Sequence, residues 1–551
     1  MDKQYQKENK INVLFSKRPI EAKEKELVLY EDYTGWNNFG FRIRCKFEIG
    51  KLHSYDSFKS DILFGFLYIQ KDDSLQIARK YTSLSSIFLE NDITLSKKDI
   101  PDFFTMLPSM QAYRKLVSHY GVKQANIILL QINDVVVKKQ KSKYSDWLKK
   151  VTQTKVFKLG FMRNSEPFFA YHNAESILNG LKEEKFDNIS KRLYLSFKLD
   201  AFSNAHKLDL KYENNSLIPK RINVLIGKNG VGKSQALKFF CRSALQYTSE
   251  KAILIDKTNS NGRPMINRLL AIGTPGETST TFPNERIKSQ KLYYRRLHLT
   301  RNGKTKATRS TVELLVQLAR LDEFIGKQYR WDIFLESLGK VLDIKKIVLK
   351  LENNTYYFLE ELKWNKGEQH TLELWSKLDY TTEPLFNYDD RYYPLSSGQL
   401  TFFKFALLAS LYIDNGSFVL MDEPETHLHP NYISNFIDLL DFLLEKTGSF
   451  ALLATHSTYL VREISREQVH VFKLDEENKI NIISPRLRTF GASIDRISEF
   501  VFEDNIENRL IDKIIERISD KEFKDIDEEI GNEISLPSLM AIKRYLKKGH
   551  K

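Results

Sequence analysis

Cysteine is scarce in this chain of 551 residues, which contains only Cys45 and Cys241. Two cysteines cannot form a disulfide framework, and these two lack the spacing of metal ligands. A reducing compartment is therefore the simplest setting. The N-terminal residues lack the apolar stretch of a secretory signal, and the most apolar helical candidate, residues 402–413, is too short to cross a bilayer. We therefore expect a cytoplasmic protein that has no membrane partner.

Long repeats are also missing. The sequence has no sustained heptads, so we expect no long coiled-coil arm. The residues that follow His456 lack an obvious set of nuclease carboxylates, so no nuclease active site is evident. Asp and Glu number 71 against 85 Lys and Arg, which gives a net charge of +14 and a pI near 9.2. This balance favours contact with nucleic acid or another polyanion, although a soluble basic surface alone would also produce it.

Hydrophobic residues make up 42% of the chain, and its length exceeds what a single core usually accommodates, so we expect two or three structural units. Strict alternation of apolar and polar residues at 41–49 predicts a half-buried antiparallel strand. Further strands are predicted at 61–70, 127–137, 193–199 and 251–256, helices at 100–120, 310–342 and 505–518, short strands with turns at 346–374, and a loop at 262–283.

A phosphate-binding motif occupies the middle of the chain. An apolar run at 222–226 predicts a buried strand, and apolar residues at helical spacing follow Ser234. Between the two, the loop fits G-x-x-x-x-G-K-[ST], in which backbone amides bind phosphate, Lys233 reaches the β- and γ-phosphates and Ser234 holds Mg²⁺. A chance match in a glycine turn is disfavoured by the flanking strand and helix. The predicted ATP-binding residues are Gly227, Lys228, Asn229, Gly230, Val231, Gly232, Lys233, Ser234 and Gln235.

A second acidic motif follows an apolar strand predicted at 418–421. The strand ends in Asp422 and Glu423, which is the Walker B arrangement. Asp422 is then placed to hold Mg²⁺, and Glu423 to act as the base toward the attacking water. A strand that ends in two solvated acids is common by itself, but this one lies downstream of a phosphate loop.

Two further motifs resemble those of ABC-type ATPases. Residues 395–399, LSSGQ, precede an apolar helix and resemble the signature motif, which contacts the nucleotide of the opposite subunit through Ser396, Ser397, Gly398 and Gln399. Ser397 stands where many members have glycine. The sequence ATHS at 454–457 resembles the switch segment, with His456 as a hydrogen-bond partner of the γ-phosphate.

The run DEPETHLHP at 422–430 is similar to the soluble branch that includes DNA-repair and overcoming-lysogeny-defect ATPases. His427 and His429 supply too few ligands for a zinc site. Without a coiled-coil arm or an appended nuclease, the chain most resembles the ATPase subunit of Septu anti-phage systems, including those found with retrons. Residues 33–49 also resemble the opening strands of that family.

The resemblance implies an α/β fold, an ABC-ATPase head with a β-rich lobe, a P-loop core, a helical signature subdomain and a small helical C-terminal extension. The implied divisions are an arm at 1–35, the β-rich lobe at 36–220, the P-loop core at 221–285, a basic helical insertion at 286–394, the signature, Walker B and switch lobe at 395–500, and the extension at 501–551.

The resemblance also implies a function. ATP and Mg²⁺ would drive head-to-tail dimerisation and hydrolysis, with Glu423 and His456 as catalytic residues, Ser234 and Asp422 as metal ligands, and a separate HNH-type nuclease as the controlled partner. A reverse transcriptase with its DNA or RNA product would be a further partner in a retron system. The alternatives are a DNA-repair or lysogeny-defect type ATPase without its own nuclease, and an ATP-bound scaffold that hardly hydrolyses.

A basic, tyrosine-bearing segment at 286–309 is the predicted nucleic-acid surface, because lysine and arginine neutralise phosphates and tyrosines stack on bases. A solvated loop is the alternative interpretation. The candidate residues are Arg286, Lys288, Lys291, Arg295, Arg296 and Arg301.

Overall fold

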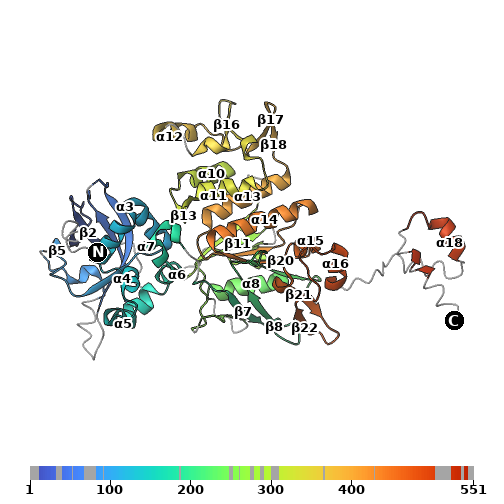
Figure 1. Cartoon of the computed structure of the whole chain (residues 1–551), viewed down its shortest axis with the longest axis horizontal. Helices are drawn as coiled ribbons and strands as arrows, with labels where there is room; N and C mark the ends of the chain where they lie inside the picture. The colour runs from blue at the N-terminus through green and yellow to red at the C-terminus, as the bar shows by residue number, and fades with distance from the viewer. Residues whose placement is uncertain are drawn as a thin grey trace.

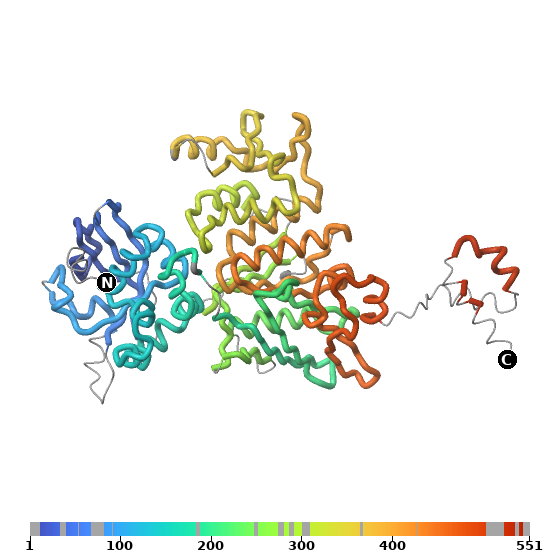
Figure 2. The backbone as a smooth tube through the Cα atoms, viewed as in Figure 1, coloured from blue at the N-terminus to red at the C-terminus, as the bar shows by residue number. Residues whose placement is uncertain are grey.

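The computed structural model describes residues 11–32, 40–52, 54–67, 82–90, 92–184, 188–246, 252–259, 261–273, 278–285, 291–299, 309–363, 367–426, 428–502, 523–534, 539–540 and 542–543. An N-terminal α/β lobe lies beside a larger part that carries the phosphate loop (Figure 1). The backbone trace in Figure 2 shows that the chain completes the lobe before it enters the larger part. The predicted α/β fold is confirmed.

The N-terminal lobe is built on a six-stranded mixed sheet of order β5-β1-β2-β3-β4-β6. The strands are β1 (Asn12–Ser16), β2 (Glu26–Glu31), β3 (Arg44–Ile49), β4 (Phe58–Phe66), β5 (Thr94–Ser96) and β6 (Phe103–Met106). They are followed by helices α3 (Met110–Gln131), α4 (Val135–Lys141), α5 (Asp146–Gln153), α6 (Ser165–Asn173) and α7 (Glu175–Asn179). The alternation at 41–49 corresponds to β3, which pairs antiparallel with β2 and β4 as predicted.

Three predictions for this lobe are wrong in whole or in part. The helix expected at 100–120 begins only at Met110, and residues 103–106 form strand β6, because they pair with β4. Residues 12–16 and 26–31 were expected in a polar arm but form the parallel pair β1 and β2, because two short apolar runs flank a charged connection. Residues 127–137 were expected as a strand but lie in α3 and α4. Asn133 has a left-handed φ of 56° between these helices, and Asp134 caps α4 by accepting a hydrogen bond from the Val137 amide at 3.0 Å.

The larger part contains a seven-stranded sheet of order β12-β11-β19-β20-β9-β21-β22. Its strands are β9 (Ile222–Gly227), β11 (Arg268–Gly273), β12 (Tyr293–His298), β19 (Phe418–Asp422), β20 (Phe450–Thr455), β21 (Val469–Leu474) and β22 (Ile480–Ile483). All neighbours pair parallel except β21 with β22. The loop predicted at 262–283 is therefore wrong in part, because β11 is a central strand whose apolar run stands between glycine- and threonine-rich segments.

Two smaller sheets accompany the seven-stranded sheet. One has the order β10-β7-β8, from β7 (Arg192–Phe197), β8 (His206–Lys211) and β10 (Ala252–Asp256). The other has the order β16-β15-β17-β18, from β15 (Ile347–Lys350), β16 (Tyr356–Phe358), β17 (Leu385–Tyr388) and β18 (Arg391–Pro394). A hairpin of β13 (Phe324–Ile325) and β14 (Gln328–Tyr329) precedes the second sheet.

Helices pack on both faces of the seven-stranded sheet. The helices of the larger part up to residue 502 are α8 (Lys233–Ala244), α9 (Thr278–Thr281), α10 (Thr311–Arg320), α11 (Arg330–Gly339), α12 (Glu368–Ser376), α13 (Ser397–Tyr412), α14 (Pro430–Thr447), α15 (Thr458–Arg462) and α16 (Ile494–Phe502). Of these, α12 lies beside the small sheet that contains β16 to β18, and the C-terminal α18 (Phe523–Ile530) lies apart from the seven-stranded sheet (Figure 1). One face packs in the same hydrophobic cluster as α8, and the other packs with α10, α11, α13 and α14. In the part of the chain that the structure describes, no helix is long and apolar enough to span a membrane.

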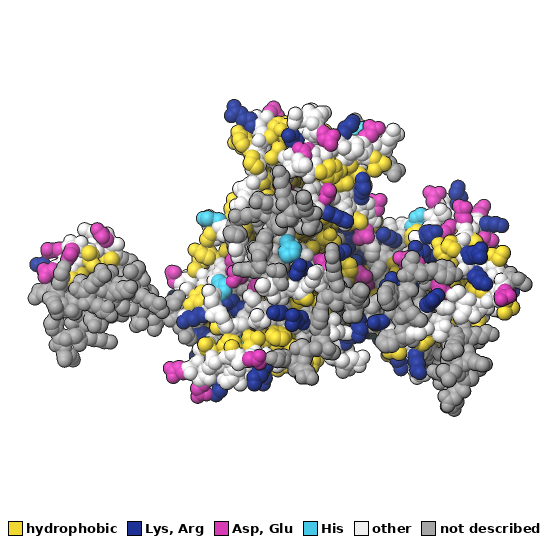
Figure 3. Space-filling view, turned by 180° about the vertical axis from the view of Figure 1, so that it is seen from behind, with side chains coloured by type: hydrophobic (Ala, Val, Ile, Leu, Met, Phe, Trp, Pro, Cys, Tyr) yellow, Lys and Arg dark blue, Asp and Glu magenta, His cyan; other side chains and the backbone are white. Residues whose placement is uncertain are grey.

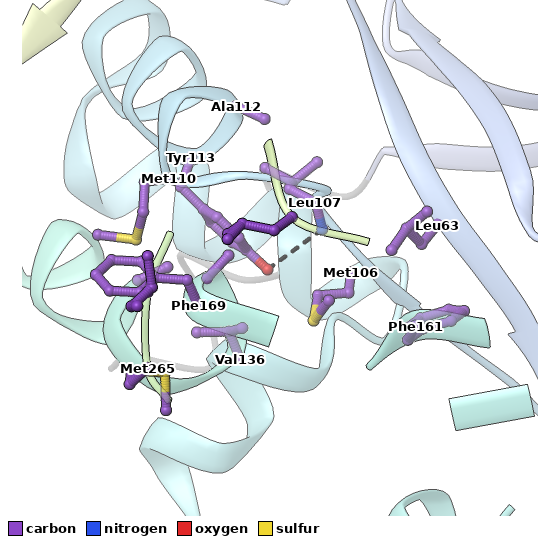
Figure 4. Packing of buried hydrophobic residues seen from close by; sticks show 14 of the residues in the cluster. Leu63, Met106, Leu107, Met110, Ala112, Tyr113, Val136, Phe161, Phe169 and Met265 are labelled. Atoms are coloured by element: carbon purple, nitrogen blue, oxygen red, sulfur yellow. Dashed lines mark hydrogen bonds between the residues drawn. The ribbon is translucent and has the colours of Figure 1, made fainter. Parts of the chain in front are cut away.

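The core of the N-terminal lobe is continuous with that of the larger part. Figure 4 shows Met110 and Tyr113 of α3, Phe169 of α6 and Met265 of the larger part in one packed group. The Tyr113 hydroxyl accepts a hydrogen bond from the Leu107 amide at 3.3 Å. The two parts are therefore fixed to each other by shared apolar packing.

A buried ion cluster strengthens the same junction. Asp414, in the turn between α13 and β19, lies 3.0 Å from Arg114 of α3, 3.5 Å from Arg268 of β11 and 3.8 Å from Arg330 of α11. Its side chain is only 1% exposed. Burial by itself would raise the pKa of Asp414, but the three guanidinium groups hold that pKa far below its usual range. Glu184 adds a second carboxylate, 2.6 Å from Arg114.

Replacing Asp414 with asparagine should destabilise the protein strongly. The change leaves three arginines around a neutral group, and breaking a buried ion pair on one side costs about 3 to 5 kcal/mol. We expect Asp414→Asn to lower the thermal unfolding midpoint clearly in calorimetry. Asp389→Asn makes the same chemical change at an exposed turn and should alter stability by less than about 0.5 kcal/mol. Equal midpoints for the two variants would contradict this view of the cluster.

Candidate nucleotide site

The phosphate loop joins β9 to α8, and two of its glycines are required by space. Gly227 has a φ of 155°, and a Cβ there would lie 2.5 Å from the backbone oxygen of Phe472. Gly232 has a φ of 99°, and a Cβ there would lie 2.9 Å from Nε2 of His206. Any larger residue would push the loop away from β8 and β21. The backbone of the phosphate loop can therefore lie against β8 and β21, and the N-terminus of α8 stays open to a phosphate.

Lys233 is the buried cation of the site, with 5% of the residue exposed. Its ammonium group donates hydrogen bonds to the carbonyl oxygens of Gly227 and Lys228, each at 2.9 Å. Burial lowers the pKa of Lys233 to about 8, although Glu423, Asp422 and Glu425 act in the opposite direction. A polyphosphate supplies the negative charge that favours the protonated lysine, so the residue fits its predicted partner.

Asp422 lies at the end of β19 and organises the predicted metal position. Its Oδ1 accepts a hydrogen bond from the Ser234 hydroxyl at 3.0 Å, and its Oδ2 accepts one from the Thr281 hydroxyl at 2.8 Å. The register pairs Asp422 with Gly273 of β11 and Ala454 of β20, so three parallel strands end at this edge. A carboxylate and a serine hydroxyl are oxygen ligands that suit Mg²⁺ bound with nucleotide phosphates.

Thr281 is a site residue that the motifs did not indicate. It ends the short helix α9, in a segment predicted as loop, and its residue is 6% exposed. Its hydroxyl donates a hydrogen bond to Oδ2 of Asp422 and so fixes the orientation of that carboxylate. Recognising β11 as the strand beside β19 would have placed the following residues at the nucleotide edge.

Glu423 and His456 face each other across the edge. Nε2 of His456 lies 3.0 Å from Oε1 of Glu423, and Nδ1 lies 3.5 Å from the Lys233 ammonium. Burial, and then the charge of Lys233, lower the pKa of His456, which favours the neutral ring at pH 7. A neutral ring that donates from Nε2 to Glu423 leaves Nδ1 as an acceptor toward Lys233. Lys233, His456 and Glu423 thus form one polar chain.

Glu425 is the second residue whose role the motifs did not indicate. Its Oε1 accepts hydrogen bonds from the Thr455 hydroxyl and, at 3.0 Å, from the His456 amide. Burial raises the pKa of Glu425. The glutamate therefore positions the switch segment at the end of β20, which in turn positions the His456 ring.

The predicted signature residues lie on a different element and do not join this group. Ser396 caps α13 by accepting from the Gln399 amide at 3.3 Å, and the Gln399 side chain accepts from the Ser396 amide at 2.9 Å. Ser396 and Ser397 are exposed, and Gly398 is buried. Within the described residues, no hydrogen bond connects these four residues to the phosphate loop, Asp422 or His456. The motif therefore presents an exposed helix N-terminus.

Half of the predicted nucleic-acid surface can be located. Arg286, Lys288 and Arg301 lie outside the described residues. Lys291 precedes β12, and Arg295 and Arg296 lie on β12, the outer strand of the seven-stranded sheet. Arg295 pairs with Glu285 at 3.1 Å, and Arg296 donates to the Phe282 carbonyl at 3.2 Å. These two cations are therefore partly engaged within the protein.

Comparison with known proteins bears on the central part of the chain. Residues 222–462 match the model of an ATPase family. The description of that family is "AAA domain, putative AbiEii toxin, Type IV TA system". Every residue of the Lys233, Asp422 and His456 group lies inside the matched range. The match supports the broad resemblance to ATPases of the ABC and SMC type.

Matches to individual proteins are distant. Protein ea59 of Escherichia phage lambda is 23% identical over 535 residues, which cover 93% of each chain. The SMC head domain from Thermotoga maritima aligns with 54% of this chain and 99% of its own, at 12% identity and a TM-score of 0.27. The transporter component cbiO1 of Clostridium perfringens aligns with 59% of this chain and 95% of its own, at 14% identity and a TM-score of 0.28. These scores are too low to define the fold, which rests on the sheet topology.

Removing the Thr281 hydroxyl should weaken Mg²⁺ use. We expect Thr281→Val to raise the Mg²⁺ concentration for half-maximal ATPase activity by about tenfold, because partners that orient a metal ligand typically contribute 10- to 100-fold. Thr281→Ser keeps the hydroxyl and should stay near wild type. A Mg²⁺ titration of ATP hydrolysis checks both variants. An unchanged Mg²⁺ requirement in Thr281→Val would remove this residue from the site.

Proposed function

We propose that this protein is an ATP-dependent switch that dimerises head to tail and controls a partner nuclease in anti-phage defence, as in Septu or retron-associated Septu systems. The observation that carries the proposal is the division of the site. Lys233, Asp422 and His456 meet at one edge of the sheet, whereas Ser397 is exposed at the start of α13. A nucleotide held by the first group leaves one side open to the signature helix of a second subunit.

The residues of one subunit have distinct tasks. ATP supplies the phosphoanhydride bond, and Mg²⁺ screens its charge when both are bound. Lys233 and the loop amides hold the phosphates, and Ser234 and Asp422 hold the metal. Glu423, oriented by His456, is placed to accept a proton from the attacking water. Ser397 of the partner subunit and the N-terminus of its α13 complete the site.

The nuclease partner and the defence role have indirect support. The matched family's description refers to a toxin and a toxin–antitoxin system. The similarity to a phage lambda protein means that a chain of this length and pattern can also be encoded by a phage. The identity of the partner is therefore the decisive observation.

The partner can be identified by affinity capture from the native host. We expect an HNH-type nuclease to copurify with the full chain, together with a reverse transcriptase if a retron is present. Glu423→Gln with ATP should retain more nuclease than wild type if the closed state binds it. Recovery of membrane permease subunits without a nuclease would contradict the defence role and favour a transporter. A chain that copurifies only with itself would favour the DNA-repair type or scaffold alternatives.

Replacing the proposed base should separate binding from hydrolysis. We expect Glu423→Gln to lower the ATPase rate by at least about 100-fold, because general base catalysis typically contributes 10²- to 10⁴-fold. ATP binding should persist and trap the dimer, which light scattering coupled to size-exclusion chromatography would detect. Glu467→Gln makes the same change at an exposed site and should behave as wild type. Slow turnover in wild type itself would favour the scaffold alternative.

Mixing two inactive variants tests the head-to-tail arrangement. Lys233→Ala disables the phosphate loop, and Ser397→Glu places a negative charge on the signature. In a mixed dimer, one site carries both defects, and the other combines an intact loop with an intact signature. We therefore expect ATPase activity to reappear on mixing. With random pairing, half of the dimers are mixed and each has one working site of two, so the activity should reach up to about a quarter of wild type. No recovery from well-folded variants would argue that each site is completed within one chain.

A further inference from the structure

Basic side chains are spread over the back of the molecule and do not form one block (Figure 3). The small β10-β7-β8 sheet nevertheless has two distinct faces. Leu193, Leu195, Leu208 and Leu210 are fully buried on its inner face. The cross-strand register places Tyr194 opposite Asp209 and Ile255, and Ser196 opposite Lys207 and Ile253. The outer face, called here the β7–β8–β10 face, consists of Arg192, Tyr194, Ser196, Lys207, Asp209, Lys211, Ile253 and Ile255.

The β8 edge of this face is cationic. Lys207 and Lys211 are exposed, and no ion pair joins either to an acid within the described residues. Asp209 is the acid on the face, and it is already paired with Arg192, whose Nε lies 2.9 Å away, and with Lys257 at 3.4 Å. Among the described residues of the face, no acid is left to neutralise the two lysines.

The β10 strand itself presents apolar side chains, and Lys257, the residue after it, reaches across to Tyr194 and Asp209. Ile253 is 55% exposed and Ile255 is 39% exposed, on the same side of an outer strand. Tyr194 lies between the two edges, and the Lys257 ammonium is 4.4 Å from its ring centre. Large apolar side chains on a sheet edge are usually avoided or covered, because they promote association. A ligand that covers this face must have one anionic side and one apolar side.

We propose that the β7–β8–β10 face binds single-stranded nucleic acid. Its phosphates follow Lys207 and Lys211 on β8, and its bases lie over Tyr194, Ile253 and Ile255. A duplex is disfavoured, because it presents phosphates toward both edges and its bases are stacked inside. A bilayer of anionic lipid would present charge at every position of the flat face, including the isoleucine edge. Phosphate neutralisation and stacking on apolar or aromatic side chains are the usual contributions to single-strand binding.

The position of the face connects it to the nucleotide site. His206 opens β8 on the inner side, and its Nε2 lies 3.1 Å from the Val231 carbonyl of the phosphate loop. The ring also stacks on Phe197 of β7, with centroids 4.5 Å apart. A nucleic-acid strand on the outer face of this sheet would therefore lie opposite the inner face, which contacts the phosphate loop. The binding inference goes beyond the proposed switch, since it requires neither hydrolysis nor a nuclease.

The test is fluorescence anisotropy of full-length protein with labelled single strands, dT20 and rU20, over a salt series. We expect Lys207→Glu/Lys211→Glu to raise the Kd by at least about tenfold and to reduce the slope of log K against log salt by about 1.4, because each single-strand phosphate contact contributes about 0.7. Ile253→Ser/Ile255→Ser should raise the Kd by about fivefold for dT20 but not for an abasic strand of the same length.

The matched control is Lys345→Glu/Lys346→Glu, which reverses the same charge at exposed positions in the 3-10 turn just before β15 and should leave the Kd within about twofold of wild type. The competing surface is tested with Arg295→Glu/Arg296→Glu. The proposal is overturned if Arg295→Glu/Arg296→Glu is the only variant that loses binding, or if neither dT20 nor rU20 binds. It is also overturned if a 20-base-pair duplex binds more tightly than dT20, or if phosphatidylserine vesicles bind and the single strands do not. ATP hydrolysis without nucleic acid should be unchanged in the lysine variants, so a failure here is separable from a failure of the switch.

Discussion

The attraction between Asp414 and three arginines is the constraint on which the arrangement of this protein depends. The carboxylate lies in the short turn between the signature helix α13 and the Walker B strand β19. Arg114 belongs to the N-terminal lobe, Arg268 begins β11, and Arg330 begins α11. One buried anion thus joins the lobe, the sheet and the helical part at a single point. Because unpaired buried charges are costly, these parts are held in one relative position.

The neighbouring glycine makes the junction more restrictive. A Cβ at Gly416 would lie 2.3 Å from the ring of Phe169, so α6 of the lobe presses directly against the turn. The Asn267 amide donates to the Gly416 carbonyl at 3.0 Å, which ties the start of β11 to the same turn. In the proposed switch, a movement of α13 would therefore also displace α6 of the lobe.

Short motifs were enough to locate the candidate nucleotide site, because the loop, the Walker B acids and the switch histidine each lie within a few residues of a strand end. Parallel pairing then brings those ends together, so Lys233, Asp422 and His456 meet as expected. Thr281 was not predicted, because the strand that precedes it, β11, has a short apolar run between glycine- and threonine-rich segments. Glu425 was visible as part of a motif, but its contact with Thr455 depends on the fold.

The ion pairs between residues far apart in the chain could not be predicted from the sequence. Arg114 and Asp414 are 300 residues apart, and neither lies in a recognisable pattern. The two strands within residues 12–31 were missed for a related reason, since a strand of five or six residues in a charged segment is stabilised by its neighbours and not by its own composition. Residues whose roles depend on distant partners can be assigned only once the topology is known.

The backbone at Glu423 has one further consequence. Its φ of 47° lies in the left-handed region, where a residue other than glycine, asparagine or aspartate costs about 1 to 2 kcal/mol. Stability alone would thus favour glycine or asparagine at this position, and a lineage that used ATP only as a structural clip would be free to accept either. The strained position carries the carboxylate whose Oε1 lies 3.0 Å from Nε2 of His456. A glycine or asparagine there would relieve the backbone and remove that contact.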